Sequence, residues 1–244
     1  MILRVALLGV LACVASPVAA QASRGDAVPP PPASEMPLDM REVHDRCVQS
    51  MVRIERPDGA FGSGFVTLLG ERRVIVTNAH VAEGADPIRV VLYDGTSLIA
   101  HARFVSDRID LAVLLTEEPL TAPALEVSDA ALVRGERVVL GGNPGGLAFI
   151  TTEGVVAGVV TGTLLSDAAC GEGNNCIVLD TEAEPGSSGG PVVDQQGHVI
   201  GMLWGVYNGT SLSMTIHGTT LATELATAAE SLSHRGRRVA RARP

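Results

Sequence analysis

Short apolar runs recur along most of this chain, and this feature limits its fold more than any other. From about Val48 onward, the runs alternate with turns rich in Gly, Asp and Asn. The runs of strand length are Met51–Ile54, Arg73–Val76, Ile88–Leu92, Leu111–Leu115, Val138–Leu140 and Val192–Val193. Tyr93–Gly95 and Gln195–Gly197 have the composition of hairpin turns. Many short strands at this spacing predict an all-β barrel or sandwich, and not alternating strands and helices.

One helical pattern follows the last strand. Between Thr220 and Leu232, apolar residues recur at helical spacing, at Leu221, Leu225, Ala228 and Leu232. Residues 235–244 then hold five Arg, and we interpret them as a disordered, Arg-rich tail. From residue 21 to 234 the chain carries 12 Arg against 27 acidic residues. The tail therefore has two other options, which are to fold back onto its own domain or to touch an anionic envelope surface.

The N-terminal end has the pattern of a secretory signal. Met1–Arg4 is a positive start, Val5–Ala15 is apolar, and Pro17–Ala20 offers small residues for cleavage. We therefore expect residues 1–20 to be a signal peptide, and the mature protein to be exported, either periplasmic or secreted. The alternatives are a buried helix and a membrane anchor, but the apolar stretch is shorter than a span of about 20 residues. Cys13 leaves a lipoprotein open, although the residues before it fit that pattern only loosely.

A proline-rich stretch comes next. Residues 21–43 contain Pro29–Pro32 and small polar neighbours, which predicts a stiff, solvated linker. The folded domain is then expected over residues 44–234.

Composition excludes several kinds of chemistry. All 18 basic residues are Arg, and the absence of Lys excludes a Lys nucleophile, a Schiff base and the Walker A lysine of P-loop NTPases. The net charge of −9 argues against a general nucleic-acid binder. No His-Glu-x-x-His or comparable ligand spacing occurs, so we expect neither a metal nor another cofactor.

Three cysteines lie beyond the signal segment. Cys170 and Cys176 flank a turn-rich stretch that can bring them together, which predicts a disulfide in an exported protein. No second Cys pair or nearby His completes a zinc set. Cys47 is left over, and we expect a buried free thiol, with intermolecular pairing as the alternative.

The segment Pro185–Pro191 has the composition of a nucleophile loop. A reactive Ser needs an exposed hydroxyl and backbone N–H groups aimed at the developing oxyanion. Gly186 precedes Ser188 by two residues and lets the chain turn tightly, so that the two N–H groups converge. An ordinary Gly/Ser loop is the alternative, but this segment lies between two apolar strand candidates, which is not the setting of a linker.

Two further motifs provide a base and its partner. His80 follows the strand Arg73–Val76 and enters a short helical turn, a rigid position that suits a general base. Asp110 abuts a buried apolar run, where a carboxylate must be paired or hydrogen-bonded. We prefer it to Asp107 as the partner of the His. A surface His and a turn Asp are the alternatives for single residues of these types.

The order along the chain is His80, Asp110, Ser188, the order found on chymotrypsin-type β-barrels. With these motifs the sequence resembles the trypsin-like serine peptidases, and within them the HtrA/DegP-like branch. The other similar segments are Gly62–Val66, Thr77–Val81, Asp110–Leu114, Gly142–Pro144, Thr152–Val156, Asp180 and Val199–Gly201.

The resemblance implies a fold and a set of roles. The fold is two six-stranded antiparallel β-barrels with a C-terminal helix, with lobes at about 44–125 and 130–217. Ser188 is then the nucleophile, His80 the acid and base, and Asp110 the group that orients the His. The N–H groups of Gly186 and Ser188 form the oxyanion hole. An extended substrate pairs with the edge formed by Leu203, Trp204 and Gly205.

The sequence also departs from the family pattern. Ser187 stands where HtrA-like enzymes usually have Asn. Glu182 stands six residues before Ser188, where the family places the base of its primary specificity pocket. A carboxylate there either selects a basic substrate side chain or points to solvent. The 170–176 segment lies where HtrA-like enzymes carry a regulatory loop, so a disulfide there suggests redox sensitivity as a hypothesis. Few residues remain after His217, and we expect no PDZ-gated regulation.

The sequence therefore predicts an exported serine endopeptidase that acts on proteins or peptides through an acyl-enzyme. The alternative is a catalytically silent, peptide-binding or scaffold protein on the same fold. We expect no nucleic-acid partner, and membrane contact only through the leader or the Arg-rich tail.

Overall fold

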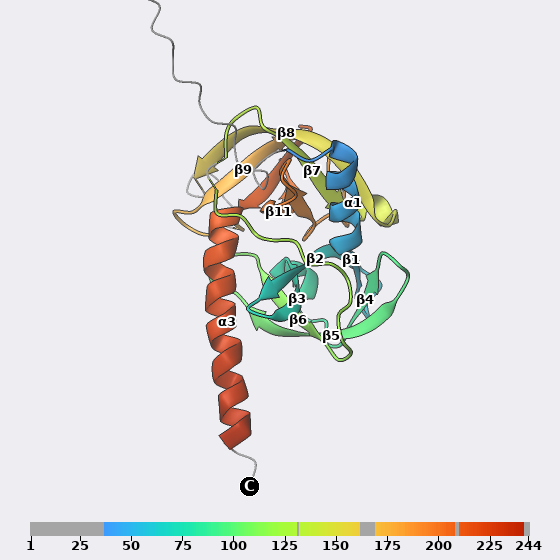
Figure 1. The fold of residues 1–244 in the computed structure, drawn as a ribbon, viewed down its shortest axis with the longest axis vertical. Helices are drawn as coiled ribbons and strands as arrows, with labels where there is room; N and C mark the ends of the chain where they lie inside the picture. Colours follow the sequence, from blue (N-terminus) through green and yellow to red (C-terminus); the bar gives the residue numbers. More distant parts are fainter. Residues whose placement is uncertain (1–36, 131, 162–168, 208–209, 242–244) are drawn as a thin grey trace, which may run out of the picture.

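The computed structural model describes residues 37–130, 132–161, 169–207 and 210–241 of the chain. Within these residues the strands form two closed barrels, each of six antiparallel strands, followed by a long helix. Figure 1 shows the barrels one above the other, with α1 and α3 lying on opposite sides of them. The predicted all-β architecture of two barrels and a C-terminal helix is thus confirmed.

The first barrel holds the N-terminal strands in the order β1-β2-β3-β6-β5-β4. The strands are β1 (Met51–Glu55), β2 (Phe61–Leu69), β3 (Arg72–Thr77), β4 (Ile88–Leu92), β5 (Ser97–Val105) and β6 (Ala112–Thr116). In β4, buried and less buried residues alternate, as expected for a strand with one face on the barrel interior. β3 pairs with β6 through Thr77 and Ala112, so the ends of the His and Asp segments lie side by side.

The second barrel has the strand order β10-β11-β12-β9-β8-β7. Its strands are β7 (Arg137–Gly142), β8 (Ile150–Thr161), β9 (Asn175–Asp180), β10 (Pro191–Val193), β11 (Val199–Val206) and β12 (Leu212–His217). The short strand β10 follows directly after the candidate nucleophile loop and pairs with both β7 and β11. The loop is therefore tied to this barrel immediately after it ends.

Helix α1 (Met40–Ser50) begins earlier than the domain boundary expected from the sequence. Its side chains Val43 and Cys47, one helical turn apart, are fully buried, and the Asp39 side chain caps its N-terminus. Leu38 N–H also donates to Gln195 O at 2.8 Å. The segment from Leu38 to Val43 is thus part of the folded body and not of the linker predicted over 21–43.

Helix α3 (Gly218–Arg241) is longer than the predicted helix. It runs from the second barrel along the side of the first and continues past it (Figure 1). The expectation of a disordered end is wrong for residues 235–241, because the helical backbone continues through them. Arg and Ala are strong helix formers, and they make up most of this segment.

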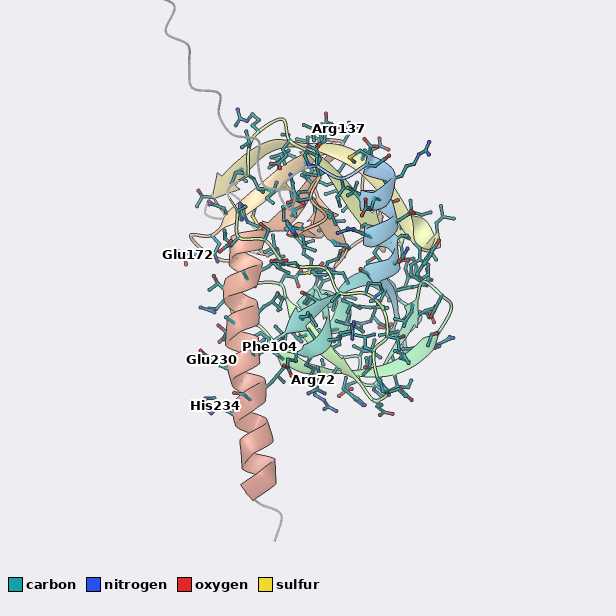
Figure 2. All side chains as sticks on the ribbon, in the orientation of Figure 1. Arg72, Phe104, Arg137, Glu172, Glu230 and His234 are labelled. Carbon is teal, nitrogen blue, oxygen red and sulfur yellow. A yellow bond between two sulfur atoms is a disulfide. The ribbon has the colours of Figure 1, made fainter. Side chains whose placement is uncertain are left out.

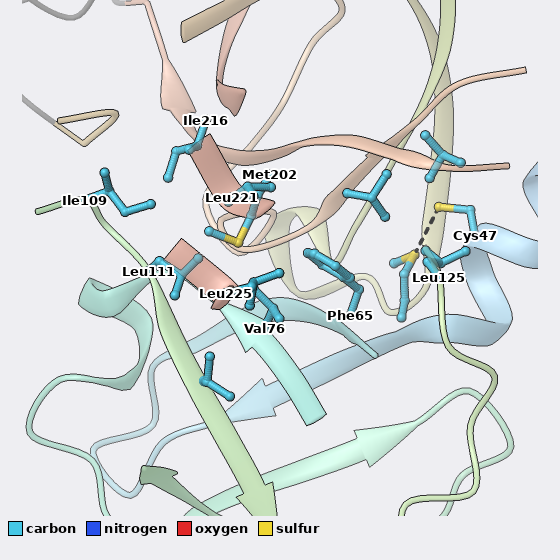
Figure 3. Close-up of a cluster of buried hydrophobic side chains, with 14 of the residues drawn as sticks. Cys47, Phe65, Val76, Ile109, Leu111, Leu125, Met202, Ile216, Leu221 and Leu225 are labelled. Atoms are coloured by element: carbon cyan, nitrogen blue, oxygen red, sulfur yellow. Dashed lines mark hydrogen bonds between the residues drawn. The ribbon is translucent and has the colours of Figure 1, made fainter. Parts of the chain in front are cut away.

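The largest apolar cluster lies where the barrels and helices meet. Figure 3 shows Phe65 and Val76 of the first barrel close to Met202 and Ile216 of the second, with α3 residues between them. Leu221 and Leu225 of α3 belong to the same cluster. Each barrel has in addition its own smaller core. Burial of this shared apolar surface holds the two barrels together, and the candidate site lies along their seam.

The predicted leader, residues 1–20, lies outside the described residues. In the part of the chain that the structure describes, no helix has both the length and the apolar character to span a bilayer.

Candidate active site

His80 lies in α2 (Ala79–Ala82), immediately after β3 ends, and its side chain is half exposed. Its backbone N–H donates to Asp110 Oδ1 at 3.0 Å, and its Nδ1 lies 2.6 Å from Asp110 Oδ2. A carboxylate oxygen can only accept a hydrogen bond, so Nδ1 carries the hydrogen. In the neutral ring, Nε2 is then the acceptor nitrogen, which is the state required of a general base.

Asp110 is fixed by its backbone as well as by its side chain. Its N–H donates to Ala169 O at 2.8 Å, and its carbonyl accepts from Asn78 Nδ2 at 2.9 Å. Only 16% of its side chain is exposed. Asp107, the rejected alternative, is exposed on the same loop. The structure thus pairs His80 with Asp110.

The loop that carries Ser188 has one peptide held in a defined orientation. Ser187 N–H donates to Glu184 O at 3.0 Å, which closes a turn whose third residue is Gly186, at φ +99°. Pro185 O accepts from Gly145 N at 2.9 Å. In a trans peptide the N–H points opposite to the carbonyl, so the Gly186 N–H points away from Gly145.

Two N–H groups of this loop are available to an outside acceptor. Within the described residues, neither the Gly186 nor the Ser188 N–H donates to a protein group. Ser188 itself is partly exposed, whereas its neighbour Ser187 is buried. No hydrogen bond joins Ser188 to His80 among these residues. The loop therefore offers the accessible hydroxyl of Ser188 and, among the described residues, two unpaired backbone N–H donors, those of Gly186 and Ser188.

The Ser188 loop is docked onto the first barrel through Ser63 of β2. Ser63 N–H donates to Ser188 O at 2.8 Å, and Ser63 Oγ donates to Gly186 O at 2.7 Å. Ser63 O in turn accepts from Thr77 Oγ1 at 2.7 Å, three residues before His80. A Cβ on Gly189 would lie 2.1 Å from Ser63 O, so only Gly allows this close approach. These contacts place Ser188 and His80 at the same seam.

Ser63 and Asn143 belong to the segments that resemble the family, but no role for either is predicted from the sequence. Both are fully buried, and Ser63 Oγ accepts from Asn143 N at 2.9 Å and from Asn143 Nδ2 at 2.8 Å. Asn143 Oδ1 accepts from Phe149 N at 3.0 Å. One signal was present, since polar residues that lie in or beside buried strands must be hydrogen-bonded. Nothing in the sequence identifies their partners.

The predicted substrate edge lies next to this loop. Leu203 N–H donates to Gly190 O and Leu203 O accepts from Gly189 N, both at 2.9 Å. The pairing of β11 with β12 shifts register between Leu203 and Gly205, and Trp204 lies at this irregularity. Leu203 thus has both of its backbone groups occupied within the protein.

Glu182 is exposed and lies beside a hollow of about 510 Å³. The lining residues are Glu182, Ala183, Glu184, Pro185, Val206, Thr210 and Ser211. The lining thus includes Pro185, the residue before Gly186, and two carboxylates, those of Glu182 and Glu184.

The predicted disulfide between Cys170 and Cys176 is present. The segment it closes packs against the Asp110 loop, because a Cβ on Gly171 would lie 2.7 Å from Arg108 O. Cys47 is a buried free thiol, and burial raises its pKa to about 12. Such a thiol is protonated and unreactive at neutral pH. Among the described residues, no group of His, Cys, Asp and Glu side chains is arranged to hold a metal ion.

The chain matches a known protein family. The family model "Trypsin-like peptidase domain" matches residues 62–202, which is more than half of the chain. This protein therefore belongs to the trypsin-like peptidases.

Its similar curated proteins are of the HtrA type. The chain is 36% identical over 131 residues to "Serine protease Do-like HtrA" of Bacillus subtilis, covering 52% of this chain and 29% of that protein. It is 38% identical over 164 residues to "Probable periplasmic serine endoprotease DegP-like" of Brucella suis, covering 66% and 30%. The chain thus spans about a third of the length of these relatives.

Solved structures share the fold. The HtrA-type protease AlgW with a tripeptide superposes with a TM-score of 0.67 at 25% identity, covering 77% of this chain and 62% of that one. The active form of the Rv3671c protease from M. tuberculosis gives a TM-score of 0.66 at 22% identity, covering 75% and 82%.

Proposed function

We propose that this protein is a serine endopeptidase in which Ser188, His80 and Asp110 act as a catalytic triad. The observation that carries the proposal is the His80–Asp110 pair, 2.6 Å apart, on one side of the seam, with the Ser188 loop docked on the other. The named relatives are serine proteases, which supports the same reaction class.

The geometry supports the following roles. Ser188 Oγ attacks the substrate carbonyl while His80 Nε2 takes its proton, and Asp110 stabilises the imidazolium that forms. The oxyanion of the tetrahedral intermediate accepts hydrogen bonds from the free N–H groups of Gly186 and Ser188. His80 then returns the proton to the leaving amine. Water then attacks the acyl-enzyme with His80 again as the base, and the ester bond to Ser188 breaks to release the acid product and the free hydroxyl. No atom changes its oxidation state in either half of the reaction.

The extended substrate pairs with the edge at Trp204 and Gly205. The substrate side chain next to the scissile bond enters the hollow lined by Glu182, and its carboxylate favours a basic side chain. A peptide library with Arg, Gln or Leu at that position measures the preference. Glu182→Gln should reduce the Arg preference more than Glu71→Gln, a change at an exposed site outside the hollow. Equal preference in both variants means that Glu182 faces solvent.

The test of the triad is labelling of the purified protein, residues 21–244, with a fluorophosphonate. The reagent reacts with an activated Ser and needs no knowledge of the substrate. Ser188→Ala should abolish labelling and lower turnover by about 10⁶-fold. Ser187→Ala is the matched control and should retain labelling, since Ser187 donates no side-chain hydrogen bond among the described residues.

Labelling that survives in Ser188→Ala would contradict the assignment of the nucleophile. Absence of labelling in folded wild-type protein would favour the alternative, a silent peptide-binding protein on the same fold.

We also propose that the protein is exported. The signal pattern of residues 1–20, the Cys170–Cys176 disulfide and the periplasmic name of a relative support this. Mass spectrometry of the N-terminus after expression in a Gram-negative host measures it. A mature chain that begins near Gln21 in the periplasmic fraction is expected, and an intact Met1 in the cytoplasm would contradict it.

A further inference from the structure

Helix α3 carries a buried carboxylate that the proposed reaction does not use. Glu224 is only 3% exposed. Its side chain contacts the loop that carries Asp110, which lies more than a hundred residues away in sequence. A buried carboxylate is costly unless charge and hydrogen bonds compensate it. The groups that compensate Glu224 all belong to the loop between β5 and β6, which carries Asp110.

Each carboxylate oxygen of Glu224 has its own partner on that loop. Oε1 accepts from Ser106 Oγ at 2.8 Å, and Oε2 accepts from Arg108 Nη2 at 2.6 Å. Arg108 Nη2 also donates to Thr227 Oγ1 at 3.1 Å, one helical turn further along α3. The helix therefore holds the loop at two of its residues.

Ser106 passes this contact on to the backbone next to Asp110. Its hydroxyl donates to Glu224, and the same oxygen accepts from the N–H groups of Arg108, at 3.0 Å, and Ile109, at 3.1 Å. Ser106 N–H donates to Leu111 O at 2.9 Å and closes the loop around Asp110. A chain of hydrogen bonds thus runs from Glu224 through Ser106 to the residue before Asp110.

The attachment of α3 to the body has an apolar basis apart from this carboxylate. Leu221, Leu225 and Ala228 of the same helix already pack into the shared core. A buried ion pair is often no more stabilising than an apolar replacement. The charge at Glu224 is therefore better explained by the geometry of the loop than by stability.

We propose that Glu224 is a positioning residue that holds the Ser106–Leu111 loop so that the Asp110 carboxylate meets His80. This proposal rests on the triad assigned above. Glu224 touches neither His80 nor Ser188, and it acts only through the loop. The C-terminal helix thereby becomes part of the construction of the site.

The test compares two Glu→Gln changes on one helix. Glu224→Gln keeps the side-chain size but removes the charge that pairs with Arg108. Glu230→Gln is the matched control, because Glu230 is exposed on α3 (Figure 2). We expect Glu224→Gln to lower kcat by about 10²-fold, the effect of a small misplacement remote from the reacting atoms, with KM within about twofold. Glu230→Gln should change neither.

A spectroscopic measurement separates positioning from folding. In proton NMR, the Nδ1–H resonance of His80 reports its hydrogen bond to Asp110 without any substrate. That resonance should shift or broaden in Glu224→Gln and stay unchanged in Glu230→Gln. An unchanged resonance and unchanged kcat in a folded Glu224→Gln protein would overturn the proposal. A protein that loses only thermal stability would do so as well.

A second variant covers the case in which Glu224→Gln does not fold. Ser106→Ala removes the central link of the same chain and should also lower kcat at constant KM. If both variants fold, the double variant should lose little more than the larger single loss, because both changes break one path. Fully additive losses would contradict a shared path. Failure of the wild-type protein to label with fluorophosphonate would instead refute the triad, so the two failures are distinguishable.

Discussion

The two barrels contribute to the candidate site in different ways. The first barrel supplies side chains, His80 and Asp110, which are joined by a 2.6 Å contact between ring and carboxylate. The second supplies mainly backbone, since the Ser188 loop presents two free N–H groups beside its one hydroxyl. The first half of the site therefore depends on the chemistry of particular side chains, and the second on the path of the chain.

Crowding around glycines sets the Ser188 loop apart from the turn at Gly59. In the second barrel, an added Cβ would meet other atoms at 2.3 Å at Gly186 and at 1.9 Å at Gly190. Gly59, in the turn between β1 and β2 of the first barrel, has a positive φ of +85°, close to the +99° of Gly186, but open space around it. Positive φ alone does not distinguish Gly186 from Gly59. The two differ in whether neighbouring atoms leave room for a Cβ.

Among the changes that compare the two barrels, the largest expected effect tests the side-chain half. Asp110→Asn should leave the fold intact but lower turnover by about 10⁴-fold, because the amide favours the wrong His tautomer. Asp107→Asn makes the same chemical change three residues away at an exposed site and should have no effect. Turnover of folded proteins with a peptide substrate measures both. A similar loss in the two variants would show that the loop, and not the Asp110 carboxylate, matters.

A smaller effect tests the backbone half. Gly186→Ala places a methyl group against Phe61 and Asn143 O, which displaces the turn that aims the Gly186 N–H. Loss of one oxyanion donor lowers kcat by about 10²–10³-fold. Gly59→Ala imposes comparable strain at positive φ without crowding and should retain the wild-type rate of fluorophosphonate labelling.

If Gly59→Ala and Gly186→Ala slow labelling equally, backbone strain alone explains the loss. The difference between the two barrels would then not hold at this position.

The smallest expected effects concern pH, and the barrels again differ. On the first barrel, hydrogen bonds to Glu117 and Asp86 raise the pKa of His101 above 6.5. Its stabilisation is fully present below about pH 6.5 and is lost as pH rises through the folded-state pKa. In the second barrel, burial lowers the pKa of His217 below 6.5. Its stabilisation is present above about pH 6.5 and is lost as pH falls through the folded-state pKa.

Thermal unfolding across pH separates the two histidines. His101→Gln should flatten the stability profile on the alkaline side of about pH 6.5, and His217→Gln on the acid side. A profile that each variant shifts uniformly, without a change of slope, would show that neither His titrates on unfolding in this range.

The sequence contained the parts of the site that are local in the chain. The His80, Asp110 and Ser188 motifs could be found because each lies beside a strand with a clear apolar pattern. Helix α1 was missed because only Val43 and Cys47 mark its buried side, within an otherwise polar segment. The contacts of Ser63 with Gly186 and of Glu224 with Ser106 join residues more than a hundred positions apart, and a single sequence has no signal for such pairs.

Helix α3 also contributes to an uneven distribution of charged residues along the chain. A helix of 24 residues is about 36 Å long, and its last part extends beyond the first barrel (Figure 1). Four Arg lie between positions 235 and 241, whereas the chain from 21 to 234 is strongly acidic. Basic residues are therefore concentrated at the end of α3, and acidic residues predominate before it. Charge divided in this way along a chain favours one orientation when the molecule approaches a charged surface at low ionic strength.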